Sequence, residues 1–294
     1  MTRGLWNRET VALMLVAAYL PLALFWLLTG VADTLPRLGL ALLVIGVWQL
    51  VFMLARAQPP SVAALVTALA IAMLAPEELG IFRMVLGISF GVVMGEQVFG
   101  GWGRNVVNPA TVTLSFLGFG FPAFDWPMFD LPVAWAAIPA ALIGIATGVM
   151  PLALFAGTAA VALATGPSGM LPQPVLIAAG ICLVLLVADP VTSAATTLGR
   201  MLQGALYAAL VALFSTSWTG AAPVQIAVAA ALLASLAAPL LDEAALSLWI
   251  AQRRRRHGRT GPQPLAPLPR AAERKPHQDR ACGVPCLGHL RGAG

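Results

Sequence analysis

The stretch GISFGVVMGEQVFGGWGRNVVNPA, residues 87–110, runs from an apolar helix directly into a glycine-rich turn. The turn carries three polar side chains, those of Arg104, Asn105 and Asn108. A polar turn at a membrane boundary costs free energy unless its groups bind each other or a ligand. This stretch therefore predicts a membrane-embedded helix and, directly after it, a candidate functional site.

The composition indicates a chain that lies largely within a membrane. Of its 294 residues, 59% are hydrophobic and 10% are charged. So much apolar surface does not fit inside one soluble core. We therefore expect an all-α fold, a polytopic membrane helix bundle, with the lipid bilayer as one of its partners.

Ten segments are apolar and approach the length needed to cross a hydrocarbon core of about 30 Å, at about 1.5 Å rise per residue. They are residues 10–29, 38–55, 61–76, 82–99, 109–122, 133–150, 151–165, 173–188, 200–217 and 223–241. The seventh is short and could be a re-entrant half-helix. An eight-span alternative makes one element of residues 133–165, but ten spans are preferred.

Charged residues predict the topology of these spans. Ten of the 17 basic residues follow residue 252, and with ten spans Arg104 and Arg200 fall on the same membrane face as that tail. Basic loops favour the cytoplasmic side. We therefore expect both termini in the cytoplasm. The tail is interpreted as an anchor that also touches anionic lipid, not as a nucleic-acid site.

A change in composition near residue 252 divides the chain. Residues 1–252 are predicted to form the transmembrane domain, and residues 253–294, rich in arginine and proline, a disordered tail. Cys282 and Cys286, flanked by histidines, could bind a metal, although their loose spacing favours disorder. Because all three histidines lie in the tail, we predict no catalytic triad, no metal site and no complete active site in the membrane domain.

Two turns in the sequence are alike. Asn108-Pro109 and Asp189-Pro190 each follow an apolar helix and precede another. Proline fits the first turn of a helix, and a preceding asparagine or aspartate can cap it, so each motif predicts a helix start. Two starts on one membrane face would hold an anionic or carbonyl-rich ligand together. Simple capping is the alternative, and parallel and inverted halves both stay open.

Glycines near the first of these turns fall into two groups. Three recur at four-residue spacing and predict close helix packing: Gly87, Gly91 and Gly95. Gly100, Gly101 and Gly103 lie in the turn, where absent side chains would admit a planar ligand or simply allow a tight turn. Glu96 ends the preceding helix, where it reaches the interface, pairs with Arg104, or serves ion passage.

These residues resemble a known family. The segment from Pro59 to Pro122 is similar to NqrB of the NqrB/RnfD family, whose members are membrane subunits of Na⁺-translocating NADH:quinone oxidoreductase and of the Rnf electron-transport complex. Residues 189–200, DPVTSAATTLGR, are similar to the family's second motif. The resemblance implies ten transmembrane helices in two related halves, placed in a bacterial inner membrane. It also implies a flavin, and other membrane and peripheral electron-transport subunits as partners, in some members coupled to ion transport.

The chain departs from the family pattern in places. Family members carry FMN covalently on a threonine of an outer loop, but residues 123–132 contain no serine or threonine. We therefore expect a non-covalent flavin, FMN or riboflavin, with quinone also possible as ligand. Ser193 to Thr196 resemble a flavin-attachment sequence but lie within the second motif, so we do not interpret them as one. Glu96-Gln97 replaces the family's Lys-Glu, and therefore Na⁺ coupling is not carried over.

The expected cofactor site joins the two turns. Arg104 would hold an anionic or carbonyl group, the glycines would admit a ring, and polar side chains would orient its edges. The predicted site residues are Gly100, Gly101, Gly103, Arg104, Asn105, Asn108, Asp189, Thr196 and Gly199. Two alternatives remain: a small-solute or ion transporter or channel of related ten-helix architecture, and a non-redox membrane scaffold for soluble redox partners.

Overall fold

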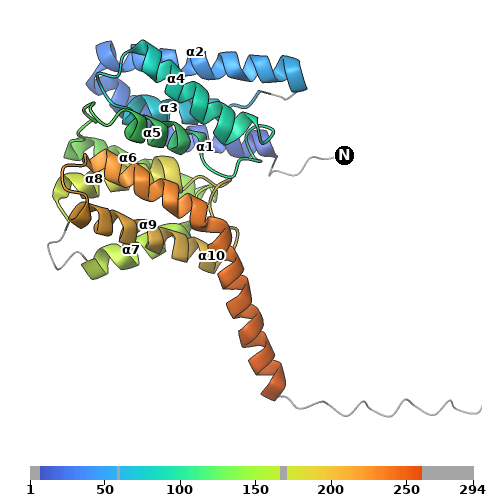
Figure 1. The fold of residues 1–294 in the computed structure, drawn as a ribbon. Helices are drawn as coiled ribbons and strands as arrows, with labels where there is room; N and C mark the ends of the chain where they lie inside the picture. The colour runs from blue at the N-terminus through green and yellow to red at the C-terminus, as the bar shows by residue number, and fades with distance from the viewer. Residues whose placement is uncertain (1–6, 58–59, 166–170, 260–294) are drawn as a thin grey trace, which may run out of the picture. The chain divides into compact units, whose positions relative to one another are not determined.

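The computed structural model describes residues 7–57, 60–165 and 171–259. Within these ranges the chain forms ten α-helices and two π-helical segments (Figure 1). They are α1 (Arg8–Thr29), α2 (Val31–Arg56), α3 (Ala64–Leu74), α4 (Ile81–Val92), η1 (Val93–Gln97), α5 (Pro109–Gly120), α6 (Leu131–Ala146), α7 (Leu152–Thr165), α8 (Gln173–Cys182), η3 (Leu183–Val187), α9 (Thr197–Ser217) and α10 (Pro223–Arg259). The all-α prediction is confirmed.

The helices differ in their ability to cross a membrane. Among the described residues, four helices are long and apolar enough to do so alone: α1, α2, α9 and α10. Most of the others are shorter than expected; α3 has 11 residues, about 16 Å in length. Such short helices are tolerated at membrane depth where other protein elements surround them. A turn separates α6 from α7, so residues 133–165 are not one element.

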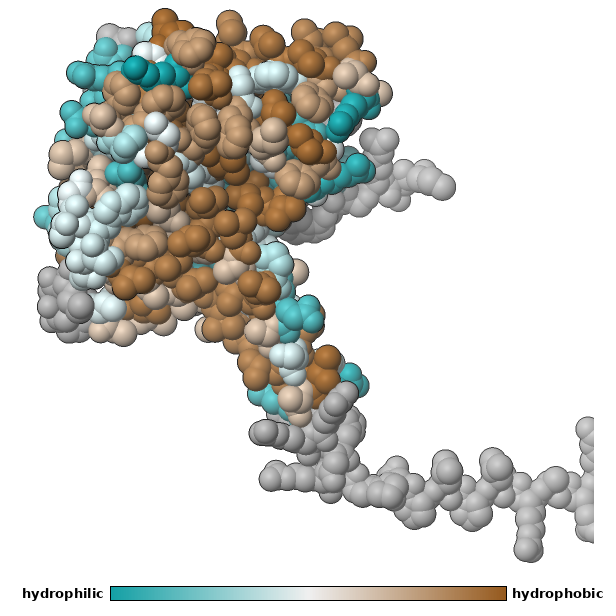
Figure 2. Space-filling view, in the orientation of Figure 1, coloured by the Kyte–Doolittle hydropathy of each residue, from teal (hydrophilic) through white to brown (hydrophobic). Residues whose placement is uncertain are grey.

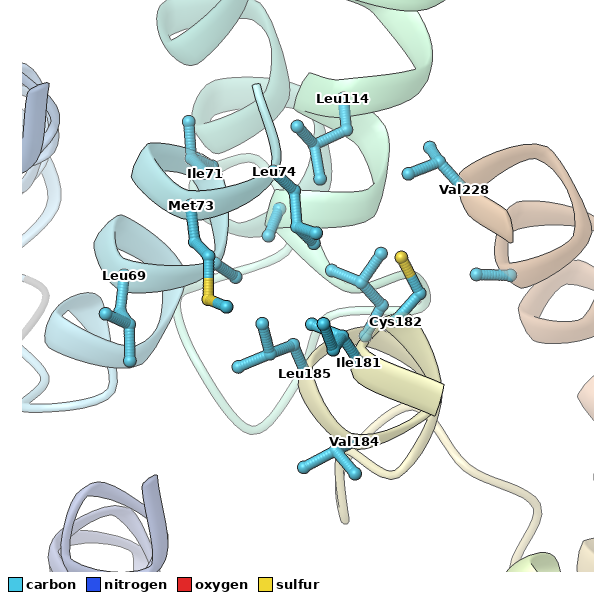
Figure 3. Close-up of a cluster of buried hydrophobic side chains, with 14 of the residues drawn as sticks. Leu69, Ile71, Met73, Leu74, Leu114, Ile181, Cys182, Val184, Leu185 and Val228 are labelled. Atoms are coloured by element: carbon cyan, nitrogen blue, oxygen red, sulfur yellow. The ribbon is translucent and has the colours of Figure 1, made fainter. Parts of the chain in front are cut away.

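The core is built around α3 and the continuous segment α8–η3. Nine residues of α3, Val66 to Leu74, are buried, and all five residues of η3 are buried. Figure 3 shows their side chains in one cluster with Leu114 of α5 and Val228 of α10. Polar backbone in these central segments is satisfied by helical hydrogen bonds, which is what burial in an apolar bundle requires.

Charged residues lie at both ends of the bundle. At one end, the Arg8 side chain at the start of α1 lies beside Gly103, 3.7 Å from the position of an added Cβ. We call this the basic end. At the opposite end, the Glu77 N–H donates to the Asp125 carbonyl at 3.1 Å and joins two acidic loops. The loops that carry Glu77 and Asp125 therefore lie together at the end opposite the basic end.

The outer surface of the bundle is apolar. Large side chains on several helices are almost fully exposed, among them Leu54 at 78%, Phe82 at 80% and Leu163 at 76%. Figure 2 shows hydrophobic side chains across the middle of the visible face of the helical body, with hydrophilic ones towards its margins. A soluble protein rarely exposes so much contiguous apolar surface. Lipid is the solvent that fits it, and the chain is a membrane protein.

Glycines set two close helix contacts in the bundle. Gly91 of α4 lies against Thr113 of α5, where an added Cβ would approach the Thr113 backbone N within 2.6 Å. This confirms the predicted packing role of the four-residue glycine repeat. Gly204 of α9 lies against Leu154 of α7, and its added Cβ would approach the Leu154 carbonyl carbon within 2.9 Å. The second contact was not foreseen.

Helix α10 continues from the bundle to Arg259, the last residue that the structure describes. Contacts separate a unit ending at Trp249 from the residues that follow it, and α10 extends to Arg259. Residues 253–259 are therefore helical, whereas disorder was expected from residue 253. The remainder of the predicted tail, with its cysteines and two of its three histidines, lies outside the described residues. The domain boundary at residue 252 stays a prediction.

Candidate functional site

Residues 98–108 form the first turn, between η1 and α5. Gly100, Gly101 and Gly103 have φ values of 104°, 86° and 94°, which glycine adopts far more readily than other residues. The Gly101 N–H donates to the Glu96 carbonyl at 3.1 Å, and the Arg104 N–H to the Gly101 carbonyl at 3.2 Å. The glycines are therefore needed for the turn itself, whether or not they also admit a ligand.

Two asparagines close the first turn. Asn105 Oδ1 accepts from the Gly103 N–H at 3.1 Å. Asn108 Oδ1 accepts from the Ala110 N–H at 2.9 Å, and Pro109 occupies the first helical position of α5. The predicted helix start at Asn108-Pro109 is confirmed, with asparagine as the cap.

The second turn, residues 188–196, is different, and the predicted helix start at Asp189-Pro190 is wrong. Helix α9 begins at Thr197, and Thr196 caps it by accepting from the Gly199 N–H at 3.0 Å. Asp189 folds its carboxylate onto its own turn, accepting from the Val191 N–H at 3.3 Å and from the Thr192 hydroxyl at 3.2 Å. The carboxylate thus stabilises a local turn rather than the start of a helix.

The two turns meet at the basic end of the bundle. Asn108 Nδ2 donates to Asp189 Oδ2 at 3.5 Å, across 81 residues of sequence. Both side chains are buried, at 6% and 4% exposure. This contact confirms that the two motifs lie on the same face. Each follows an α-helix that ends in a five-residue π-helix, a distortion often found near functional sites.

Glu96 and Arg8 complete the polar cluster. Glu96 is 2% exposed, so it does not reach the interface, and its electrostatic neighbours are Arg8 and Asp189 rather than Arg104. Arg8 Nε is buried without a hydrogen-bond partner. Arg8 is not among the predicted site residues, because nothing in the sequence indicates that α1 begins beside the first turn.

Arg104 and Trp102 take opposite positions in the first turn. The Arg104 side chain is exposed and folds over Gly100, with Nη1 3.3 Å from the position of an added Cβ. Trp102 is 4% exposed and packs against Ala12 of α1 and Ala63 before α3. Trp102 anchors the turn, while Arg104 presents a positive charge at its surface.

Thr196 and Gly199 belong to another cluster, whose centre is Asp242 of α10. Asp242 Oδ1 accepts from the Thr196 N–H at 2.9 Å and from its hydroxyl at 2.6 Å, and Oδ2 accepts from the Ala195 N–H at 2.6 Å. An added Cβ on Gly199 would overlap Asp242 Oδ1 and lie 2.6 Å from Thr196 Oγ1. The start of α9, which carries the predicted site residues Thr196 and Gly199, is therefore occupied by a carboxylate of the chain itself.

Electrostatics favour a ligand without extra negative charge at this site. Burial raises the pKa of the Asp189 carboxyl to about 6, against the opposing effects of the Val191 N–H and the Thr192 hydroxyl. Glu96 is a second buried carboxyl that interacts electrostatically with Asp189. The arrangement offers hydrogen-bond donors from Arg8 and Asn108, and these suit carbonyl oxygens of a planar ring.

Comparison with known proteins agrees with the sequence resemblance. Residues 6–130, which include the first turn, match the NQR2, RnfD, RnfE family. The resemblance of this part of the chain to that family is confirmed.

The chain is similar to three bacterial proteins, each named as a subunit of a Na(+)-translocating NADH-quinone reductase. It is 40% identical to the Yersinia pestis protein over 97 residues, 33% of this chain and 24% of that protein. It is 37% identical to the Stutzerimonas stutzeri protein over 94 residues, 32% and 23% of the two chains. It is 39% identical to a Pseudomonas aeruginosa protein over 97 residues, which are 33% of this chain and 24% of that protein. The similarity thus spans about a quarter of these curated relatives.

Proposed function

We propose that this chain is a membrane subunit of a flavin-dependent electron-transport complex, and that it binds a flavin or a quinone non-covalently at the first turn. The observation that carries the proposal is the contact of Asn108 with Asp189, which joins both family motifs into one buried polar cluster. The relatives are named as subunits of an NADH-quinone reductase, and this name supports the redox assignment.

The donors around the first turn fit a carbonyl-bearing ring. Arg8 Nε is buried and unpaired, so a ligand oxygen beside Gly103 would satisfy an N–H that otherwise costs about 1–3 kcal/mol of desolvation. Arg104 would close over the ligand from the exposed side, and Asn105 would hold the turn in shape. A bound flavin or quinone supplies the electron-accepting chemistry, which no side chain of this cluster provides.

Thr196 and Gly199 play a supporting part in this proposal. Asp242 already fills the start of α9, so these residues would fix the second turn and with it the position of Asp189. This narrows the predicted ligand contacts to the first turn and Asp189. A phosphate at the start of α9 would have to displace Asp242, so a phosphate-free ring, riboflavin or quinone, fits better than FMN.

The partners and topology follow from the same proposal. The redox complex would supply the other membrane and peripheral subunits, and an ion would be transported only if a partner couples electron flow to it. By the positive-inside rule, the basic end with the first turn would face the bacterial cytoplasm. Both chain termini would then face the cytoplasm.

Absorption spectroscopy on purified protein tests the proposal. The chain is purified in mild detergent, alone and with its membrane partners, and any chromophore is released by denaturation and identified by mass spectrometry together with extracted quinone. We expect released riboflavin or quinone at near-stoichiometric amounts, and a loss of most of it in Arg8→Ala. The matched control is Arg83→Ala, at the opposite end of the bundle, which should retain the ligand.

Two outcomes would contradict the proposal. Protein that carries neither flavin nor quinone in either preparation would remove its basis. Uptake of a solute into liposomes without a redox partner would instead favour the transporter alternative. A flavin that stays attached to the denatured chain would retain the redox function but show that attachment is covalent.

A further inference from the structure

A cavity of about 670 Å³ opens at the opposite end of the bundle from the first turn. Its walls come from the end of α1, the start of α2 and residues 127–133. The residues that matter for its chemistry are Trp26, Asp33, Arg37, Glu77, Phe129 and Asp130. The volume is typical of sites that hold small organic groups.

The cavity lies at the depth of lipid headgroups. Helix α1 has 22 residues, about 33 Å of helix, which just exceeds the hydrocarbon core of about 30 Å. When Arg8 lies at one interface, the residues from Phe25 to Gly30 that line the cavity lie at the other. Phospholipid headgroups surround the protein at this level, so a lipid is the ligand that is always available there.

The cavity offers groups of both charge signs. Arg37 Nη2 donates to the carbonyl of Ala75 and, at 3.1 Å, to that of Pro76, so these bonds fix the guanidinium and leave Nε and Nη1 facing other directions. Asp33 and Glu77 interact electrostatically with Arg37. The carboxylates of Asp33, Glu77 and Asp130 belong to exposed residues, so they are available to a ligand.

We propose that this cavity binds the headgroup of an amine-bearing phospholipid, such as phosphatidylethanolamine. The ammonium group would lie among the carboxylates of Asp33, Glu77 and Asp130, and the phosphate would accept from Arg37. Trp26 and Phe129 provide apolar wall for the glycerol and upper acyl carbons. Three carboxylates and one arginine give the cavity a net negative charge, which disfavours an anionic lipid. The primary ammonium of ethanolamine can donate N–H hydrogen bonds to these carboxylates, whereas the trimethylammonium of choline has no N–H to donate.

Lipid binding to delipidated protein tests this assignment. Native mass spectrometry compares dioleoyl-phosphatidylethanolamine with the choline and glycerol lipids of the same chains. We expect the ethanolamine lipid to bind about threefold to tenfold more tightly than either, the scale of two or three exposed ion pairs. The double variant Glu77→Gln/Asp130→Asn should lose that preference.

The control removes the same two charges outside the cavity. Glu78→Gln/Asp125→Asn alters two exposed residues of the same loops that do not line the cavity, and it should keep the preference for the ethanolamine lipid. Equal binding of the three lipids, tightest binding of the glycerol lipid, or an equal loss in the control would overturn the proposal. Binding of soluble phosphoethanolamine as tight as that of the lipid would overturn the assignment to a lipid.

Discussion

Two hairpins of the molecule share one local order but are stabilised in different ways. The first hairpin is α4, η1, the first turn and α5, residues 81–120, and the second is α8, η3, the second turn and α9, residues 173–217. In the first, the two helices pack on each other at Gly91, and Asn108 caps its own helix. In the second, α9 packs on α7 at Gly204, and Asp242 of α10 holds the turn.

The difference shows that a repeated motif does not guarantee repeated packing. Residues of the first hairpin itself, Asn105 and Asn108, close its turn and cap α5, and Arg104 lies at the surface of that turn. The second depends on two other helices, and its helix start is occupied. A ligand site is therefore expected on the first turn, while the second turn contributes Asp189 as a neighbour.

The largest expected effect comes from filling the two helix contacts. Gly91→Ala and Gly204→Ala each place a methyl group against the backbone of a neighbouring helix. Overpacking of this kind costs about 1–3 kcal/mol or more, and thermal unfolding in detergent should show a clear drop in midpoint for both. Gly180→Ala on α8, where an added Cβ meets nothing within 4 Å, is the control. A drop in only one hairpin would show that the other contact can relax.

Removing Asp242 should damage the second turn alone. Asp242→Ala leaves two backbone N–H groups and the Thr196 hydroxyl without their acceptor. The site is only partly buried, so water compensates in part, and we expect a loss of about 1–2 kcal/mol. Thermal unfolding measures it, with Glu243→Ala at the next, exposed position as control. Equal unfolding midpoints for the two variants would contradict the role given to Asp242.

Removing the cap of the first hairpin should cost less. Asn108→Ala removes the acceptor for the Ala110 N–H, at a cost of about 1 kcal/mol, together with a long contact to Asp189. Asn108→Ser keeps a capping oxygen and should restore most of the unfolding midpoint without restoring the contact. If serine fails to restore the midpoint, then the contact with Asp189 dominates.

The smallest effect on stability is expected at Arg104. Its side chain is exposed, so Arg104→Ala should change the free energy of unfolding by less than about 0.5 kcal/mol. Ligand affinity should nevertheless fall about tenfold, the scale of one hydrogen bond to a charged group. Titration with riboflavin and a short-chain quinone measures the affinity. A large loss of stability without loss of affinity would place Arg104 in the fold rather than in the site.

Local patterns predicted the helices well and the long-range contacts poorly. The cap at Asn108 and the packing of Gly91 depend on residues nearby in sequence, so both could be read from it. Asp242 lies 46 residues from Thr196. No pattern in the second motif indicates that the carboxylate of Asp242 accepts hydrogen bonds at the start of α9. The position of Arg8 in the site could not be predicted for the same reason, because the contact of α1 with the first turn arises only when the bundle is packed.

Coupling between Asn108 and Asp189 tests most directly whether the two turns form one site. Asn108→Ala, Asp189→Ala and the double variant are titrated with riboflavin and a short-chain quinone, with the fluorescence of the tryptophans, including the buried Trp102, as signal. The account predicts that each single variant weakens binding and that their effects are non-additive by at least about 0.5 kcal/mol. Additive effects, or binding that neither substitution alters, would contradict it.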